Sequence, residues 1–233
     1  NVLLGLLMVF AIGAVVGLID SFLIIKLRVP AFIATLGMMG LLTGITRLLT
    51  GGTTFFPFFI PDSITFLGRG FVLGIPFQVF ILFGITLVSV FILEYYYIGR
   101  HLYATGGNKV AAMHVGINTI KMKVMAFIVC QLYAVLAGIT ATSMLGAGNA
   151  EVCTGYQMPA ISAAFMGGVF LKGGLPNPWG TFIASILMAM LANGFVMLGF
   201  SQSLKEIVQG LILLLAVSLV TTNKKGEVIN AGM

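Results

Sequence analysis

Long uncharged stretches alternate with short charged ones along this chain. Five of the stretches that contain no Asp, Glu, Lys or Arg are residues 1–19, 29–46, 70–93, 124–150 and 173–204. A charge at the centre of a bilayer costs on the order of 3 kcal/mol even on the lenient insertion scale, so uncharged runs mark sequence that can lie in lipid. Each run is about long enough for a helix across a hydrocarbon core of roughly 30 Å. The pattern therefore predicts an all-α fold, a polytopic transmembrane helical bundle.

Six or seven membrane segments are predicted in a single transmembrane domain that covers residues 1–233. Their approximate bounds are 2–25, 31–50, 76–97, 124–145, 159–171, 179–199 and 204–220. Because the chain begins without Met and already inside apolar sequence, we expect an N-terminal part to precede it.

The charged residues orient these segments. The 12 Lys and Arg outnumber the 6 Asp and Glu, but they stand singly or in pairs at the ends of apolar segments, which is typical of topology signals rather than of a nucleic-acid-binding surface. Residues 99–123 carry six Arg, Lys and His residues and no acidic one. We therefore expect a cytoplasmic loop at 99–123. Asp20, near the predicted cytoplasmic end of its segment, is expected at the membrane interface.

Segment 159–171 is apolar but only about 13 residues long, which is too short for an upright span. It either crosses with help from its protein neighbours or re-enters. Lys224 and Lys225 place the end of the last segment on the cytoplasmic side. Two membrane segments, 179–199 and 204–220, separate these lysines from residues 172–178, so residues 172–178 are expected on the cytoplasmic side as well. Charge therefore favours a crossing.

A complete short helix is predicted inside the basic loop. Gly106 and Gly107 give a flexible entry, Asn108 is a favoured N-cap, and Gly116 stands where a left-handed residue ends a helix. Between these ends, apolar residues recur at helical spacing: Val110, Met113 and Ile117.

An apolar stripe on a helix outside the lipid needs a partner. The helix could lie on lipid headgroups, it could pack against the ends of the protein's own spans, or it could insert into a groove on a separate soluble protein. The residues alone leave these three interpretations open.

Several stretches resemble the permease subunits of bacterial ABC importers for monosaccharides, the group that also includes autoinducer-2 importers. The similarity covers nearly the whole chain in order. It is carried by the block 26–37, by Gly99-Arg100, Gly106-Gly107-Asn108, Ala111-Ala112 and Gly116-Ile117 in the basic loop, and by Gly155-Tyr156, Gly167-Gly168 and Asn193-Gly194 further on. The chain departs from the family pattern at Gln157-Met158-Pro159 and at Leu175-Pro176-Asn177-Pro178.

The resemblance implies a function in the bacterial inner membrane. It implies that the basic loop is a coupling loop that docks on a nucleotide-binding ATPase subunit through Gly106, Gly107, Asn108, Val110, Ala111, Met113, Gly116 and Ile117. It also implies a second permease chain, identical or paralogous, and an extracytoplasmic solute-binding protein. The small polar solute would be a monosaccharide or a related carbohydrate-like molecule.

Catalytic and metal sites are not expected. The sequence contains no Gly-x-x-x-x-Gly-Lys-[Ser/Thr] phosphate loop, so ATP hydrolysis would belong to a partner. His101 and His114 have no cysteine or carboxylate at metal-ligand spacing. No cofactor and no nucleic-acid partner are expected, and the chain is not expected to be an enzyme.

Polar side chains inside the predicted spans are candidates for a solute pathway, because a sugar needs hydrogen-bond partners along its path. They are Thr35, Thr43, Gln131 and Asn193, for which hydrogen bonding between helices is the competing interpretation. Glycine pairs four residues apart, Gly13 with Gly17, Gly40 with Gly44 and Gly70 with Gly74, predict close helix packing.

An ion-coupled secondary transporter or channel is the alternative function. Such a protein would be expected to carry carboxylates at mid-membrane depth. The sequence offers almost none, which favours the ATP-driven importer.

Overall fold

The computed structural model describes residues 2–56, 61–149, 151–172 and 175–230, and nearly all of them are helical. The helices are α1 (Val2–Ile25), α2 (Ala31–Thr50), α3 (Asp62–Arg69), α4 (Phe77–Val90), α5 (Tyr97–Gly107), α6 (Lys109–His114), α7 (Thr119–Leu145), α8 (Gln157–Lys172), α9 (Pro178–Met197) and α10 (Gln202–Asn230). A π-helical segment, Phe91–Tyr95, follows α4, and a 3-10 turn, Thr154–Tyr156, precedes α8. Two short strands, β1 (Phe71–Val72) and β2 (Ile75–Pro76), pair antiparallel.

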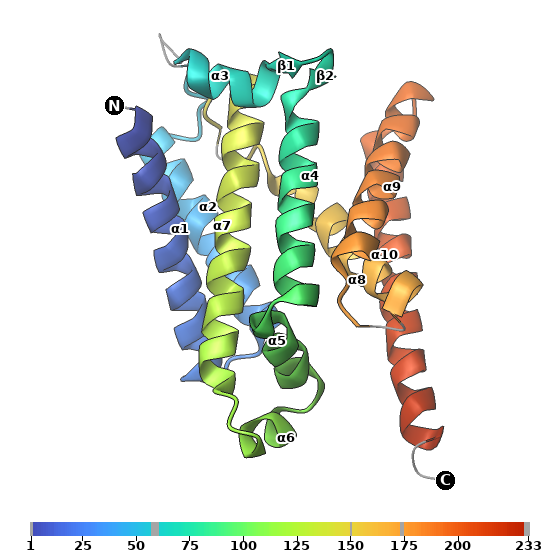
Figure 1. Cartoon of the computed structure of the whole chain (residues 1–233). Coiled ribbons are helices and arrows are strands. Elements are labelled where there is room, and N and C mark those ends of the chain that lie inside the picture. Colours follow the sequence, from blue (N-terminus) through green and yellow to red (C-terminus); the bar gives the residue numbers. More distant parts are fainter. Residues whose placement is uncertain (1, 57–60, 150, 173–174, 231–233) are drawn as a thin grey trace. The chain divides into compact units, whose positions relative to one another are not determined.

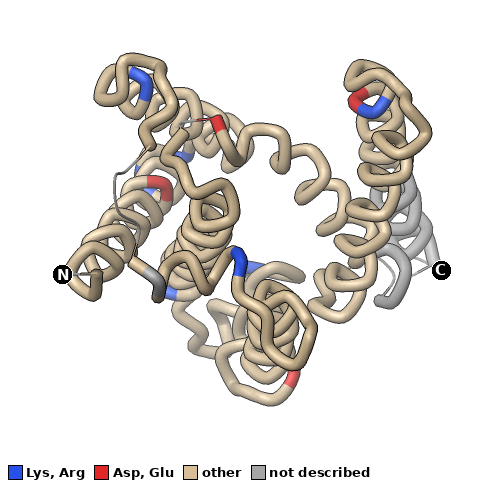
Figure 2. Tube along the Cα trace, turned by 90° about the horizontal axis from the view of Figure 1, so that it is seen from above, with Lys and Arg blue, Asp and Glu red and all other residues tan. Residues whose placement is uncertain are grey.

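Five helical segments of the described chain are long and apolar enough to cross a membrane. They are Val2–Ile25, Ala31–Thr50, Phe77–Tyr95, Thr119–Leu145 and Pro178–Met197. Their bounds lie close to the predicted ones, although α7 begins five residues before the predicted 124. Figure 2 shows how few charged residues interrupt the trace. The predicted polytopic helical fold is confirmed.

The chain forms two compact units, and the first comprises Asn1–Ile85 and Phe91–Cys153. Helices α1 and α7 lie side by side in it (Figure 1). They approach closely because α1 presents glycines to α7: a Cβ atom on Gly17 would stand 2.9 Å from the Ile128 Cα, and one on Gly13 would stand 2.5 Å from the Val135 Cγ2. The prediction of close packing is confirmed for this pair.

The other two glycine pairs do not bring helices together in the described chain. Nothing lies within 4 Å of a Cβ placed on Gly40 or Gly44. Gly70 faces the Phe66 side chain of the preceding helix, and Gly74 has a φ of +79°, which is the left-handed conformation of a turn residue. The prediction was wrong for Gly70 and Gly74, which lie at the end of α3 and in a turn, and Gly40 and Gly44 meet no other helix within the described chain.

One end of α7 is covered by α3 and the other carries α6 (Figure 1). The guanidinium of Arg69 donates to the carbonyls of Met144 at 3.0 Å and Leu145 at 2.9 Å, and the Ser143 hydroxyl donates to the carbonyl of Ile64. The two Arg69 bonds satisfy carbonyls that the end of α7 leaves without partners within the helix.

The second unit comprises Thr86–Val90 and Thr154–Met233. Helices α8 and α9 meet at Gly167 and Gly180, where either Cβ atom would overlap the backbone of the other helix. Next to this crossing, Ala163, Ala184 and Met188 form a buried core. The 16 residues of α8 are helical throughout, and they span about 24 Å along the helix axis.

Residues 175–178, where the sequence differs from the family pattern, contain the start of helix α9. The Asn177 side chain accepts a hydrogen bond of 3.1 Å from the Trp179 backbone N–H, and Pro178 occupies the first helical position, where it needs no N–H donor.

Candidate functional site

The chain enters the basic loop through a sharp bend that requires a glycine. The π-helical segment ends at Tyr95, and α5 begins at Tyr97. A Cβ atom at Gly99 would overlap the backbone carbonyls of Ile92 and Leu93. Any larger residue at position 99 would therefore push α5 away from the end of the preceding span.

Helix α5 was not predicted, because its sequence was interpreted as loop. Its Tyr97 and His101 rings pack edge to face at 5.7 Å, and the buried Thr105 hydroxyl donates to the carbonyl of His101 at 2.7 Å. Gly106 and Gly107, predicted as a flexible entry, instead form the last turn of α5. The loop 99–123 is thus mostly helical, with only short connections before and after α6.

The predicted N-cap of the loop helix is confirmed. The Asn108 side-chain oxygen accepts hydrogen bonds from the backbone N–H groups of Val110 and Ala111, both at 3.0 Å. These are two of the donors that the first turn of a helix leaves without partners. Helix α6 therefore begins at Lys109, directly after the cap.

The predicted left-handed residue is confirmed at the other end. Gly116 has a φ of +81°. Its N–H donates to the carbonyl of Met113, and the N–H of Ile117 donates to the carbonyl of Ala112, both at 3.0 Å. This pair of bonds is the Schellman arrangement that closes many helices. The six residues of α6 are fixed at both ends by local sequence.

The exposed side of α6 carries most of the apolar stripe. Val110 is 57% exposed and Met113 is 49% exposed, whereas Ala112, with 2% exposure, is the buried residue of this helix. Ile117 is half-buried. The small Ala112 therefore seats α6 against the protein's own helices, and that contact leaves Val110 and Met113 uncovered. Val115, which sequence reasoning missed, is 75% exposed as well.

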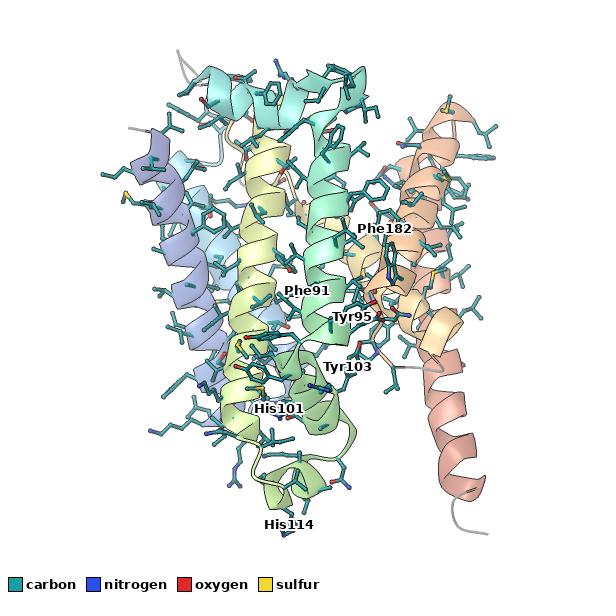
Figure 3. The ribbon with its side chains drawn as sticks, in the orientation of Figure 1. Phe91, Tyr95, His101, Tyr103, His114 and Phe182 are labelled. Atoms are coloured by element: carbon teal, nitrogen blue, oxygen red, sulfur yellow. The ribbon has the colours of Figure 1, made fainter. Side chains whose placement is uncertain are left out.

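Two longer helices hold α6 in place. Helix α5 leads into it, and α7 begins directly after it at a second capping residue, Asn118, which accepts from the Lys121 N–H at 3.0 Å. Thr119 and Met122 in the first turn of α7 are buried. Figure 1 shows α6 beyond the ends of α5 and α7, and Figure 3 shows His114 at its tip, pointing away from the spans.

The charge of this region is one-sided. Arg100, Lys109, Lys121 and His114 are exposed, and residues 99–123 contain no acidic side chain. The surface around the exposed Val110 and Met113 is therefore basic. It suits either an acidic protein groove or anionic headgroups.

The four pathway candidates lie in different settings. The Thr35 hydroxyl donates within its own helix to the carbonyls of Ala31 at 2.9 Å and Phe32 at 3.1 Å. Thr43 is half-buried on the same helix, and Asn193 is exposed on α9 in the second unit. Gln131 pairs across helices instead: its amide donates to the Asp20 carboxylate at 3.0 Å.

Asp20 is the polar residue whose setting sequence reasoning missed. It was expected at the membrane interface, but it is 0% exposed between α1 and α7. Its position relative to Gly13 and Gly17 gave a signal, because residues 13, 17 and 20 share one helix face. Because the face of α1 that carries Gly13 and Gly17 packs on α7, Asp20 on the same face is buried as well.

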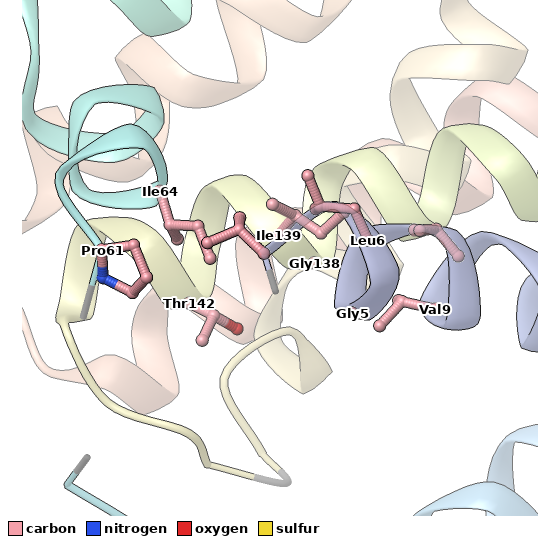
Figure 4. A pocket seen from close by; sticks show the side chains of 10 residues that line it. Gly5, Leu6, Val9, Pro61, Ile64, Gly138, Ile139 and Thr142 are labelled. Atoms are coloured by element: carbon pink, nitrogen blue, oxygen red, sulfur yellow. The ribbon is translucent and has the colours of Figure 1, made fainter. Parts of the chain in front are cut away.

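A hollow at the end of α1 and α7 opposite the basic loop provides few hydrogen-bond partners for a sugar. It measures about 630 Å³, and its lining includes Leu6, Val9, Pro61, Ile64 and Ile139 (Figure 4). Among the described residues of this lining, Thr142 contributes the one side-chain hydroxyl. A polyhydroxylated solute would leave most of its hydrogen-bonding groups without partners there.

Comparisons with known proteins find similarity over most of the chain. The family model described as "Branched-chain amino acid transport system / permease component" matches residues 1–217. The ribose import permease protein RbsC of Escherichia coli K12 is 37% identical over 97% of this chain and 70% of its own length. RbsC of Bacillus subtilis is 34% identical over 86% of this chain and 62% of its own length.

An autoinducer 2 import system permease protein, LsrC of an Enterobacter strain, is 31% identical over 90% of this chain and 61% of its own length. No solved structure gives a significant match.

Proposed function

The chain belongs to the permease-component family of bacterial importers, and from this premise we propose that it conducts a monosaccharide or a related carbohydrate-like solute into the cell. It is a multi-pass protein of the inner membrane. The family description names branched-chain amino acids, whereas the relatives RbsC and LsrC are named for import of ribose and of autoinducer 2. The proposal follows those relatives.

The energy for import comes from a partner subunit in this proposal. The sequence has no phosphate-binding loop of the P-loop type. The observation that carries the proposal is α6: a short helix fixed at both ends, seated on the chain through Ala112, with Val110 and Met113 exposed in a basic surround. A helix with exposed apolar anchors suits a groove on another protein.

The docking surface comprises the residues that form or shape this helix: Gly106, Gly107, Asn108, Val110, Ala111, Met113, Gly116 and Ile117. Asn108 and Gly116 fix the two ends, and Val110 and Met113 supply the contacts. Because α6 continues into α5 on one side and α7 on the other, a movement of the ATPase subunit would be transmitted to both.

Two further partners belong to the proposal. A second permease chain, identical or paralogous, would complete the pathway, and an extracytoplasmic solute-binding protein would deliver the solute. Within the pathway, Thr35, Thr43, Gln131 and Asn193 are the proposed polar contacts. Segment 159–171, which forms most of α8, is proposed to cross the membrane, with Gly167 against Gly180 supplying protein contact.

Uptake into proteoliposomes tests the function. The chain would be purified with its ATPase subunit and binding protein, and labelled monosaccharides, ribose among them, and labelled leucine would be offered with ATP inside the vesicles. We expect ribose uptake, or uptake of another monosaccharide, to persist after ionophores collapse the proton and sodium gradients and to stop without ATP. Uptake that needs a gradient and not ATP would support the ion-coupled alternative, and uptake of leucine alone would contradict the proposed solute class.

A further inference from the structure

An open groove runs along one side of the α1 and α7 pair, near the end that carries the basic loop. Its volume is about 510 Å³, and its walls include Leu18, Phe22 and Ile25 from α1 and Ile120 and Val124 from α7. Leu18, Phe22 and Ile120 are each half or more exposed. Apart from Ser21 and Lys26, the residues that line the groove are apolar.

The groove has the length of one membrane leaflet. It extends from Val15 to Lys26 on α1, which corresponds to about 16 Å along a helix axis. Half of a hydrocarbon core of roughly 30 Å is about 15 Å. An acyl chain that enters beside Lys26 would therefore be covered along its length and would end near the bilayer midplane.

The mouth of the groove is positively charged. The ammonium group of Lys26 stands 5.7 Å from the centre of the Phe22 ring, so the charge lies directly above the apolar wall. On α7, Lys121 and Lys123 are sequence neighbours of the lining residues Ile120 and Val124, so on the helix they lie to either side of the face that lines the groove. Arg28 is exposed just beyond the end of α1.

The described residues that line the groove include no acidic side chain. The nearest acidic residue in the sequence of α1, Asp20, is 0% exposed and turned into the contact with α7, where it meets Gln131. A zwitterionic headgroup would bring a positive group to this mouth, whereas a headgroup such as that of phosphatidylglycerol carries only negative charge. Basic pockets between helices on the cytoplasmic side suit anionic lipid headgroups.

We infer that this groove is a binding site for an anionic phospholipid of the cytoplasmic leaflet, with an acyl chain between α1 and α7 and the phosphate at Lys26, Lys121 and Lys123. A helix from another protein chain is the competing occupant. It would have to bring carboxylates to the mouth to match the same charges.

Fluorescence quenching tests the site directly. The single tryptophan of the sequence, Trp179, lies in the second unit, so a Trp179→Phe background allows a reporter in the groove through Val124→Trp. The full chain would be reconstituted in vesicles that contain phosphatidylglycerol or phosphatidylcholine brominated on the acyl chains. We expect phosphatidylglycerol to associate with the reporter at least about fivefold more strongly, since one basic residue near the surface is worth about that factor.

Two controls separate the groove from general lipid contact. Lys26→Gln combined with Lys121→Gln and Lys123→Gln should bring the preference close to one. A reporter at Leu7→Trp, which is 62% exposed near the other end of α1, should show no preference between the two lipids. If Val124→Trp does not fold, Ile120→Trp reports from the same wall.

Equal quenching by both lipids at the groove would overturn the inference, because it would indicate ordinary lipid contact. Absence of quenching by either lipid would overturn it as well, because it would indicate that protein covers the groove.

Discussion

The amide of Gln131 on α7 donates a hydrogen bond of 3.0 Å to the Asp20 carboxylate on α1. The two residues are 111 positions apart in the sequence, and Asp20 is fully buried. Its second carboxylate oxygen has no hydrogen-bond partner among the described residues. The bond to Gln131 is therefore important for an acid that would otherwise be buried without compensation.

Replacement of Gln131 by Leu should destabilise the chain more than a loss of one ordinary hydrogen bond. Removal of one partner from a buried polar pair costs about 1 to 3 kcal/mol, because the other partner keeps its desolvation cost. The measurement is the free energy of unfolding in detergent, or the apparent Tm of the purified protein. The double variant Asp20→Leu with Gln131→Leu should recover most of the loss, since neither polar group is then left buried.

Thr140→Val is the matched control on the same helix. The Thr140 hydroxyl bonds to the carbonyl of Leu136 within α7 at 2.8 Å, so its loss leaves no partner on another helix. If Thr140→Val and Gln131→Leu lower stability equally, the special importance assigned to the Gln131 pair is wrong.

Gly17→Ala should loosen the contact between α1 and α7. The added methyl group would stand 2.9 Å from the Ile128 Cα, and backbone cannot move aside as a flexible side chain can. Overpacking of this kind costs about 1 to 3 kcal/mol, which thermal unfolding would report as a lower Tm.

Gly40→Ala on α2 is the control for this change, because nothing lies within 4 Å of the added atom. Ala is favoured over Gly inside a helix by about 0.5 to 1 kcal/mol, so the control should hold or raise the Tm. An equal decrease in Tm for both variants would show that the position within a helix, and not the contact with Ile128, determines the loss of stability.

Cys153 should react with a membrane-impermeant maleimide from the extracytoplasmic side. It is exposed in the connection between α7 and α8, which a crossing by α7 from the expected cytoplasmic loop 99–123 would place outside. Partial burial raises the pKa of its thiol above the usual range, so the reactive thiolate is the minor species at neutral pH. The labelling rate should therefore rise about tenfold for each pH unit between 7 and 8.

Spheroplasts and inside-out vesicles give the two sides for this measurement. Cys153→Ser should abolish the labelling, since Cys130 lies within α7, at a depth that a water-soluble reagent does not reach. Labelling in inside-out vesicles alone would reverse the proposed topology.

Local signals predicted much of the candidate site. Asn108 and Gly116 fix the ends of α6 through bonds to residues within five positions, so a short sequence window contains what is needed. The spans were predicted for a similar reason: hydropathy alone determines which stretches can lie in lipid.

Contacts between distant segments were not predictable in the same way. The role of Gly99 depends on carbonyls of the preceding span, and the setting of Asp20 depends on which face of α1 meets α7. The same Gly-x-x-x-Gly spacing occurs at Gly13 and Gly40, yet only Gly13 meets another helix. The pattern shows where a close approach is possible, and the fold decides where it occurs.

The central claim is that α6 is the surface on which an ATPase subunit docks, and a pull-down of that subunit by the double variant Val110→Asp with Met113→Asp tests it most directly. Both side chains are exposed, so membrane insertion and yield should not change. Burial of two carboxylates without partners costs on the order of 3 kcal/mol, so recovery of the ATPase should fall about a hundredfold and ATP-driven uptake should stop. Leu27→Asp, at an exposed apolar residue beside the cytoplasmic end of α1, should retain both. Full recovery of the ATPase together with normal uptake in the double variant would contradict the claim.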